Sequence, residues 1–223
     1  MSQPFIRNHQ YNEIKKRIDQ LQNACNTVSN RKVVEAVRHE VEVKLNGLFV
    51  DLNDEQKSMF ENLQKLQTTA DFQRYMHALE PYLEVEYAQV SELHLKKLFP
   101  KHKKLKMPDL RCIDERRMTY LGWTDLAANK LFIVYDLNGK LIGIEGKYTP
   151  TNKKGVCFVC NRHAEVALFT AVTKWKPAGA SPDYYRAIGN YMCLDSDVCN
   201  KNITDVDVLE TFIHGVLVGP THR

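Results

Sequence analysis

Four cysteines in the last third of the chain constrain its fold more than any other feature of the sequence. They form two pairs, Cys157 with Cys160 and Cys193 with Cys199. A gap of two residues lets the first two thiolates reach one metal ion from a tight turn, and a second pair about thirty residues later can complete a tetrahedron. Four thiolates leave no open coordination position. The spacing therefore predicts one structural zinc ion rather than a catalytic metal.

Two other uses of these cysteines stay open on the sequence alone, namely disulfide bonds and a redox or catalytic metal. Disulfides are rare in reducing compartments, and the N-terminus lacks the apolar core of a signal peptide. No apolar run approaches the length that spans a membrane. We therefore expect a cytoplasmic protein without a membrane partner. Cys25 and Cys112 lie outside the metal set, and Cys25 continues a helical apolar stripe, so packing is its expected role.

Apolar residues recur every three or four positions in the first half of the chain, which is the pattern of amphipathic helices. These stripes cover residues 11–28, 33–48, 59–66 and 72–79. Asn53 and Gln56 are expected to cap the third helix. Four helices with short connections predict an all-α helical bundle, which we assign to residues 1–110.

The periodicity changes in the second half of the chain. Residues 130–135 and 141–144 are apolar, strand-like runs on either side of an Asn138-Gly139 turn, and this combination predicts a β-hairpin. The hairpin leads towards the first cysteine pair, where Asn161 follows the second cysteine. Asn tolerates the positive φ that such a turn often needs.

A further strand is expected over residues 165–173 and a final helix over residues 205–218, with Thr204 as its N-cap. The hairpin, the two cysteine pairs, the strand and the helix together predict an α+β treble-clef-like zinc-binding domain over residues 111–223. The fold class is therefore two domains, an all-α bundle followed by this zinc domain.

A basic run over residues 101–106 lies between two prolines. It can be a solvated linker, or it can contact an acidic protein surface or RNA phosphates. No aromatic residues interleave with its lysines, which argues against base stacking, and the formal net charge of the chain is only +4. Direct nucleic-acid binding is therefore not expected. A zinc-ribbon-like RNA- or DNA-binding protein that uses this run with Lys153 and Lys154 stays as the alternative.

His163 and Glu165 resemble part of a zinc-deaminase signature, in which a His-x-Glu precedes a Pro-Cys-x-x-Cys. Here the Cys-x-x-Cys comes first, no proline precedes the second pair, and four thiolates already fill the coordination shell. Asp195 and Asp197 are typical of turns and helix caps, and the sequence offers them no partner base. We therefore predict that the protein is not an enzyme.

Several separated motifs resemble the FusB-type family, whose members bind elongation factor G and confer fusidic acid resistance. The motifs lie at residues 9–11, 122–129, 155–161, 191–200 and 204–205. The most specific are Gly155-Val-Cys-Phe-Val-Cys-Asn161 and Tyr191-Met-Cys-Leu-Asp-Ser-Asp-Val-Cys-Asn200. These motifs occur in one order. They span residues 9–205, so the resemblance covers nearly the whole chain.

The resemblance implies a helical N-terminal domain and a C-terminal treble-clef domain with zinc at Cys157, Cys160, Cys193 and Cys199. It also implies a non-enzymatic role. Members of the family bind elongation factor G, mainly through the zinc domain, and promote its release from ribosomes stalled by fusidic acid.

Aromatic and basic side chains near the cysteine pairs are the expected contacts with elongation factor G, because interface energy concentrates in such residues. They are Phe158, Lys153, Lys154, Tyr184, Tyr185 and Arg186. Phe158 lies between the first two cysteines, where its side chain has little room to become buried. The alternative is that Phe158 and one of the two tyrosines belong to a small core.

Overall fold

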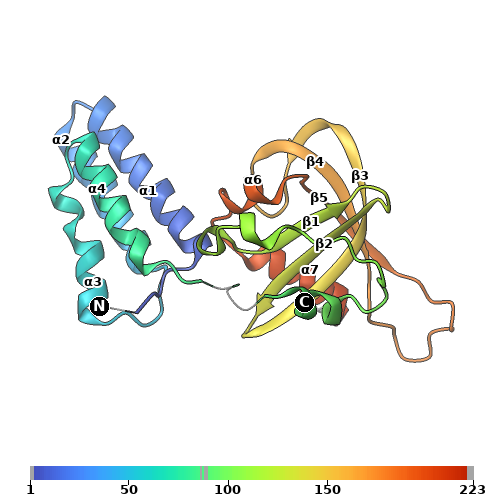
Figure 1. Cartoon of the computed structure of the whole chain (residues 1–223). Helices are drawn as coiled ribbons and strands as arrows, with labels where there is room; N and C mark the ends of the chain where they lie inside the picture. The colour runs from blue at the N-terminus through green and yellow to red at the C-terminus, as the bar shows by residue number, and fades with distance from the viewer. Residues whose placement is uncertain (1–2, 86, 88–89, 220–223) are drawn as a thin grey trace. The chain divides into compact units, whose positions relative to one another are not determined.

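The chain divides into two compact units, Met1–Glu84 and Val85–Arg223, in a computed structural model (Figure 1). The structure describes residues 3–85, 87 and 90–219, apart from the side chains of residues 62, 112 and 152, so the Cys112 side chain lies outside it. The sequence places the domain boundary after residue 110, whereas the units divide after Glu84. The reason is that the short helix at residues 92–98 packs on the sheet of the second unit.

The first unit is a helical bundle with one apolar core. Its elements are α1 (Asn8–Thr27), α2 (Arg31–Asn46), α3 (Asp54–Glu61), η1 (Asn62–Lys65), α4 (Thr69–Leu79) and η2 (Glu80–Tyr82). All four predicted stripes are helical, and their apolar residues meet in the core. Asn53 and Gln56 form the predicted reciprocal cap, with backbone-to-side-chain bonds of 3.0 and 2.8 Å. No helix in the described part of the chain is long and apolar enough to cross a membrane.

A buried cation, Arg38, joins two parts of this bundle. The side chain is only 7% exposed, and its guanidinium donates to the backbone carbonyls of Leu63 and Leu66, the latter at 3.2 Å. These carbonyls belong to the end of the α3–η1 segment, where the Leu63 carbonyl also accepts from the Leu66 N–H at 3.1 Å. Glu35, 3.8 Å from the Nε atom, supplies a partly screened counter-charge. Arg38 therefore fastens the end of this segment to α2.

The second unit is built on a five-stranded antiparallel sheet in the order β1-β2-β3-β4-β5. Its strands are β1 (Leu121–Asp125), β2 (Lys130–Leu137), β3 (Lys140–Val156), β4 (His163–Val172) and β5 (Ala187–Cys193). Its helices are α5 (Glu92–Leu98), η3 (Leu110–Cys112), η4 (Glu115–Arg117), α6 (Ser196–Asn200) and α7 (Asp207–Leu217). The predicted hairpin, strand and last helix are therefore present, although β3 continues far beyond the predicted run.

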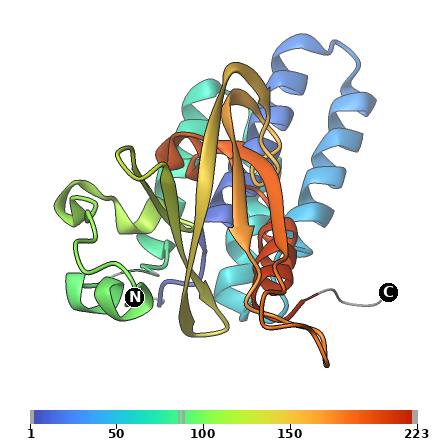
Figure 2. The same ribbon diagram turned by 90° about the vertical axis from the view of Figure 1, so that its right-hand side faces the viewer.

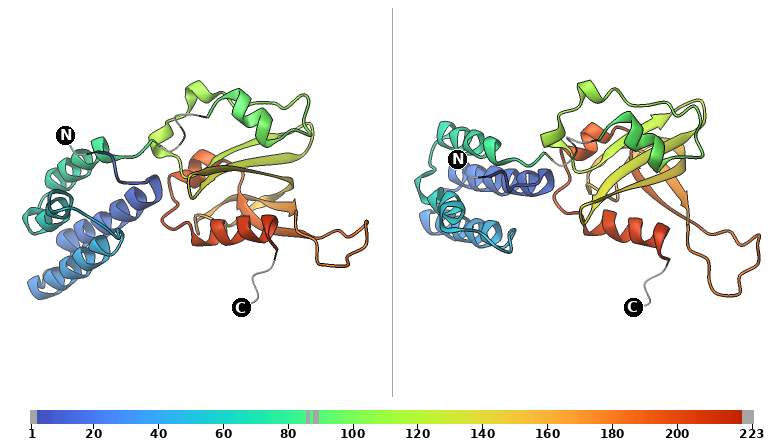
Figure 3. Two further views of the ribbon diagram at one scale, coloured as in Figure 1. Left: turned by 90° about the horizontal axis from the view of Figure 1, so that it is seen from below. Right: turned by 60° about the horizontal axis from the view of Figure 1, so that its bottom comes forward.

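Strand β2 is covered on both faces, which explains its continuous apolar run. Leu131 and Ile133 point into a core shared with α7, whereas Phe132 and Val134 point into a second core shared with α5. Figures 2 and 3 show α5 and α7 on opposite sides of the sheet. The α5 side is closely packed, because a Cβ atom on Gly143 of β3 would lie 2.8 Å from the Phe99 ring.

The turn predicted between β2 and β3 is present, but the predicted cap of the last helix is wrong. Asn138 and Gly139 have φ values of 55° and 79°, as a type I′ turn requires. Thr204 does not cap α7, which begins later. Instead the Asp205 carboxylate accepts a hydrogen bond of 2.8 Å from the backbone N–H of Asp207.

Replacing Arg38 with Gln is expected to lower the free energy of unfolding of the first unit by roughly 2–4 kcal/mol, because buried carbonyls lose a charged donor. Arg31→Gln, at an exposed position of the same helix, is the matched control and should change it by less than about 0.5 kcal/mol. Trp123 and Trp175 both lie in the second unit. Far-UV circular dichroism during guanidinium denaturation will therefore report mainly on the bundle and tryptophan fluorescence on the other unit. Equal circular-dichroism midpoints for the two variants would contradict the assigned role.

Candidate metal centre

The four predicted cysteines converge on one buried point of the second unit. Cys157 follows β3, Cys160 precedes β4, Cys193 ends β5 and Cys199 lies in α6. Their Sγ atoms all lie within 4.8 Å of one another, with separations of 3.8 Å for Cys157–Cys199 and 3.6 Å for Cys160–Cys193. A Zn–S distance of about 2.3 Å requires tetrahedron edges of about 3.8 Å, whereas a disulfide requires about 2.05 Å. The sulfur positions fit a zinc ion and not disulfides.

The backbone around the first pair forms the turn that such a site needs. Asn161 has a φ of 52°, as its place after the second cysteine predicts, and its N–H donates to the Cys157 carbonyl at 2.9 Å. The Cys157 N–H donates to the Arg162 carbonyl at 2.9 Å. The Cys193 N–H in turn points at the Cys157 sulfur at 3.4 Å. These bonds orient the thiolates before any metal is considered.

Helix α6 carries the fourth cysteine and is held at both of its ends. Asp195 caps it by accepting bonds of 2.8 and 3.3 Å from two backbone N–H groups. At the other end Asn200 is 2% exposed, and its side chain accepts from the N–H groups of Thr119 and Tyr120 and donates to the Tyr120 carbonyl. The residue next to Cys199 therefore ties α6 to the chain that enters β1.

The four thiols cannot all ionise without a cation. Hydrogen bonds from Cys160, Cys193 and Cys199 lower the pKa of Cys157. The same cluster raises the pKa values of Cys193 and Cys199, because hydrogen bonding with Cys157 and Cys160, together with burial, favours their protonated thiols. A divalent metal ion reverses this balance by stabilising all four thiolates. The donor set, soft sulfur in a closed tetrahedron, suits zinc.

The sequence matches two protein-family descriptions in order along the chain. Residues 5–85 match "Elongation factor G-binding protein, N-terminal", and residues 99–211 match "FBP C-terminal treble-clef zinc-finger". The fold is similar to a solved structure described as "Structure of the fusidic acid resistance protein FusC". That comparison has a TM-score of 0.78 and 29% sequence identity, and it covers 95% of this chain and 97% of the other. Among curated proteins, none matches the sequence.

The chain belongs to the FusB-type family of elongation factor G-binding proteins. Membership confirms the predicted fold class, a helical domain followed by a treble-clef zinc-finger domain. The four clustered cysteines lie within the residues that match the zinc-finger description.

Tyr120 belongs to the surroundings of the centre and was missed by sequence reasoning. It is 1% exposed, and its hydroxyl finds no hydrogen-bond partner among the described residues. Burial raises the pKa of this phenol well above its ordinary value, and the neighbouring Cys199 sulfur raises it further. The phenol therefore stays protonated beside a ligand sulfur. No motif in the sequence marks this position, because only the fold brings it to α6.

The predicted contact residues around the first pair differ in exposure. Lys153 and Lys154 are exposed on β3. Phe158 is half-buried, and its ring centroid lies 5.2 Å from that of Phe212 on α7. The alternative that Phe158 contributes to a core is therefore supported in part, since one side of its ring packs on the sheet core.

The other predicted contacts lie in the long loop between β4 and β5, residues 173–186. Tyr185 is 68% exposed, while Tyr184 and Arg186 are half-buried. The Thr173 N–H donates to the Arg186 carbonyl at 2.8 Å, which closes the base of the loop.

Two further exposed apolar residues lie beside the centre. Tyr191 is 48% exposed and Leu168 is 38% exposed, and the two are paired across β5 and β4. The Tyr191 carbonyl accepts a bond of 2.8 Å from the Phe158 N–H. Sequence reasoning used Tyr191 only as part of a motif, since its outward direction depends on the strand register.

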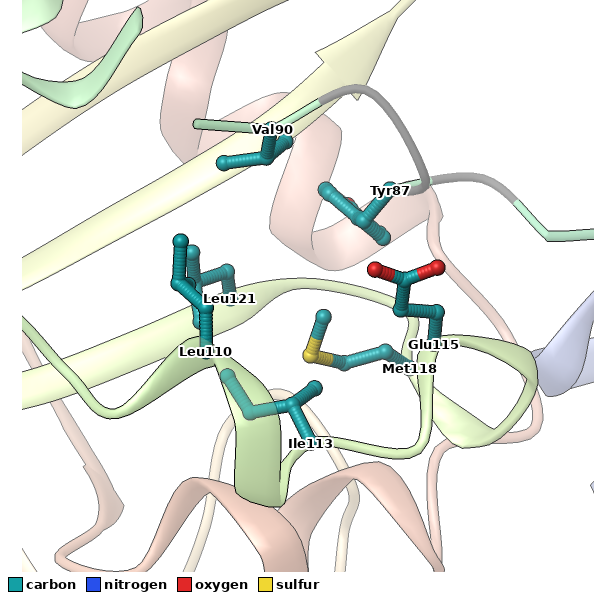
Figure 4. A pocket seen from close by; sticks show the side chains of 7 residues that line it. All are labelled: Tyr87, Val90, Leu110, Ile113, Glu115, Met118 and Leu121. Atoms are coloured by element: carbon teal, nitrogen blue, oxygen red, sulfur yellow. The ribbon is translucent and has the colours of Figure 1, made fainter. Parts of the chain in front are cut away.

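Two pockets in the described part of the chain, one in each unit, are lined by residues other than the four cysteines. A cavity of about 10 Å³ in the second unit is lined mainly by apolar side chains such as Leu110, Ile113 and Met118, with Glu115 at its edge (Figure 4). That volume holds about one water molecule. An open groove of about 270 Å³ in the first unit carries Lys57 as its basic residue and Glu61 as its acidic one. Neither hollow is a candidate for the metal chemistry.

Cys199→Ser is expected to abolish stoichiometric zinc binding and to lower the unfolding midpoint of the second unit. Zinc in small fingers contributes roughly 10–16 kcal/mol of apparent binding free energy, which folding of the site depends on. Cys25→Ser, in α1 of the other unit, is the matched control and should keep its zinc. Atomic absorption measures metal content, and tryptophan fluorescence follows the unfolding. Full zinc occupancy in the Cys199→Ser protein would contradict the four-ligand assignment.

Asn200→Ala is expected to destabilise the second unit by roughly 2–4 kcal/mol, because three buried backbone groups lose their partner. Asn202→Ala removes one exposed side-chain bond of 2.7 Å from the same turn and should cost about 1 kcal/mol or less. Guanidinium denaturation of the zinc-loaded proteins, followed by tryptophan fluorescence, compares the two. Similar losses for both variants would show that Asn200 has no special role.

Proposed function

We propose that this protein binds elongation factor G, promotes its release from ribosomes stalled by fusidic acid and so confers resistance without catalysis. The observation that supports this most strongly is that residues 5–85 match the elongation factor G-binding description and residues 99–211 the zinc-finger description, in the order that the fold of a fusidic acid resistance protein also covers. We further propose that one zinc ion holds the binding unit together. Because elongation factor G acts in the cytoplasm, we place this protein there as well.

Release without catalysis requires only a difference in affinity. A partner that binds the factor more tightly in its ribosome-free or altered state shifts the population towards that state, and the coupling free energy equals this difference. A coupling of about 1.4 kcal/mol changes the equilibrium tenfold. Such a mechanism needs a well-ordered binding surface and no reactive groups. A thiolate site without an open coordination position would order the surface without adding a reactive group.

We place the contact surface on the second unit, in two parts: the turn of the first cysteine pair, and the loop between β4 and β5 at the opposite end of these two strands. Tyr185 and Arg186 offer an aromatic and a basic side chain in a loop with a closed base, and Lys153 and Lys154 add exposed positive charge. Phe158 completes this set from the first turn. Aromatic and Arg side chains carry much of the binding energy in protein interfaces.

Tyr185→Ala and Arg186→Ala should each weaken binding to elongation factor G by roughly 1–2 kcal/mol, or about 5- to 30-fold, with zinc content unchanged. Phe158→Ala should also weaken binding but lower the unfolding midpoint, because its ring packs on Phe212. Leu126→Ala is the control, since this side chain is 69% exposed in the turn after β1. Calorimetric titration against purified factor measures each affinity. Unchanged affinity in both the Tyr185 and Arg186 variants would move the surface elsewhere.

A chain of residues 85–223 loaded with zinc should bind elongation factor G with an affinity close to that of the whole protein, whereas residues 1–84 should bind far more weakly. The division follows the compact units. Size-exclusion chromatography of each piece with the factor, without nucleic acid, makes the comparison. Binding by residues 1–84 alone would instead place the contact surface for elongation factor G on the first unit.

A further inference from the structure

The basic run of the sequence, residues 101–106, is fixed to the sheet of the second unit. His102 pairs with Glu145 of β3, and the Lys130 ammonium lies 3.2 Å from the same carboxylate and 3.3 Å from the His102 ring. The His102 ring also packs edge-on against Phe132, with centroids 5.2 Å apart. One end of the run is therefore held by an ionic cluster and by the core on the α5 side.

The other end of the run is held by a tryptophan. The Trp123 indole N–H donates to the Lys106 carbonyl at 2.8 Å. Leu105 and Met107 pack against the same core. We call residues 101–106 the lysine strap, because both ends are attached and the lysines between them face solvent. The lysine strap is therefore not the solvated linker that the sequence left open.

The charges of the lysine strap are exposed and unpaired with acidic groups. Its lysines are Lys101, Lys103, Lys104 and Lys106, and all four are exposed. Within the described residues, none of them lies in an ion pair with a carboxylate. The stretch 96–106 contains six lysines and no Asp or Glu. The small net charge of +4 for the whole chain thus hides a local concentration of positive charge.

We propose that the lysine strap binds the phosphate backbone of double-helical RNA. Lysine is a compact point charge that serves phosphate contacts, and neutralised phosphates release counterions whatever their sequence. Protein interfaces are instead depleted in Lys and enriched in Arg and aromatic residues. The strap contains neither Arg nor Phe, Tyr or Trp, and its neighbours Phe99 and Trp123 are buried.

The lysine strap has no exposed aromatic side chains, and this favours double-helical RNA over single-stranded RNA. Single strands are held by stacking of unpaired bases on aromatic rings, whereas double-helical RNA is recognised through its shape and backbone. A rigid row of ammonium groups suits the second kind of contact. The expected binding is therefore electrostatic and independent of sequence.

The strap and the Phe158 part of the proposed protein-binding surface lie on opposite faces of the sheet. The strap packs with α5 on one face of the sheet, while Phe158 packs on Phe212 of α7 on the other face (Figure 3). The inference does not rest on binding of elongation factor G. A protein that touched both would hold the factor with one side of its sheet and an RNA helix with the other.

The test uses the whole zinc-loaded protein and a fluorescein-labelled RNA hairpin of arbitrary sequence. Fluorescence anisotropy from 50 to 200 mM KCl should give a slope of log K against log [KCl] of roughly −3 to −4, a loss of about 100-fold in affinity, if four lysines each neutralise one phosphate. Single-stranded polyuridylate should bind more weakly. Each single Lys→Gln change in the strap should lower the magnitude of the slope by about 1.

The decisive comparison is between two fourfold variants of equal charge. Changing Lys101, Lys103, Lys104 and Lys106 to Gln should remove most hairpin binding. Changing the exposed lysines 32, 57, 65 and 140 to Gln should preserve it. Zinc content and the tryptophan-fluorescence midpoint show that both variants are folded. Equal losses in the two variants, or wild-type binding that does not depend on salt, would overturn the proposal. Loss of elongation factor G binding by the strap variant without hairpin binding by the wild type would instead indicate an acidic protein partner.

Discussion

The second unit depends on the meeting of four sulfur atoms. The ends of β3, β4 and β5 and the short helix α6 come together at one centre, with two thiolates from the turn between β3 and β4, one from the end of β5 and one from α6. Helix α6 is only one turn long, and isolated helices of that length are unstable in water. Its position relies on Cys199, on the Asp195 cap and on the bonds that Asn200 makes to residues 119 and 120. The thiolate centre and this buried amide together connect the C-terminal part of the chain to the start of the sheet.

The sheet separates two hydrophobic cores of the second unit and supports the elements packed on each face. Alternate residues of β2 enter two different cores, so the strand fixes α7 on one face and α5 with the lysine strap on the other. This arrangement gives a unit of modest size two faces with different chemistry. One face leads to the thiolate turn and its aromatic neighbours, and the other presents lysines.

Much of this structure could be predicted from the sequence, because its signals are local. The helical stripes, the Asn138-Gly139 turn and the spacing of the cysteines each depend on residues close together in the chain. What could not be predicted depends on long-range contacts. Strands β1 and β5 are short and interrupted by glycines, so their sequences carry weak alternation, and α5 was assigned to the wrong unit because its partner strand lies about forty residues later. Arg38 and Tyr120 have no sequence signature, and Asn200 appears only as the last residue of a motif, since burial gives all three their roles.

The closed base of the loop between β4 and β5 has a consequence for how this family can change. The strand ladder and the Thr173–Arg186 bond fix the two ends, while the residues between them contribute little to either core. Substitutions at the tip therefore alter what the loop touches with little effect on folding. The sequence of this segment can therefore change separately from the rest of the chain.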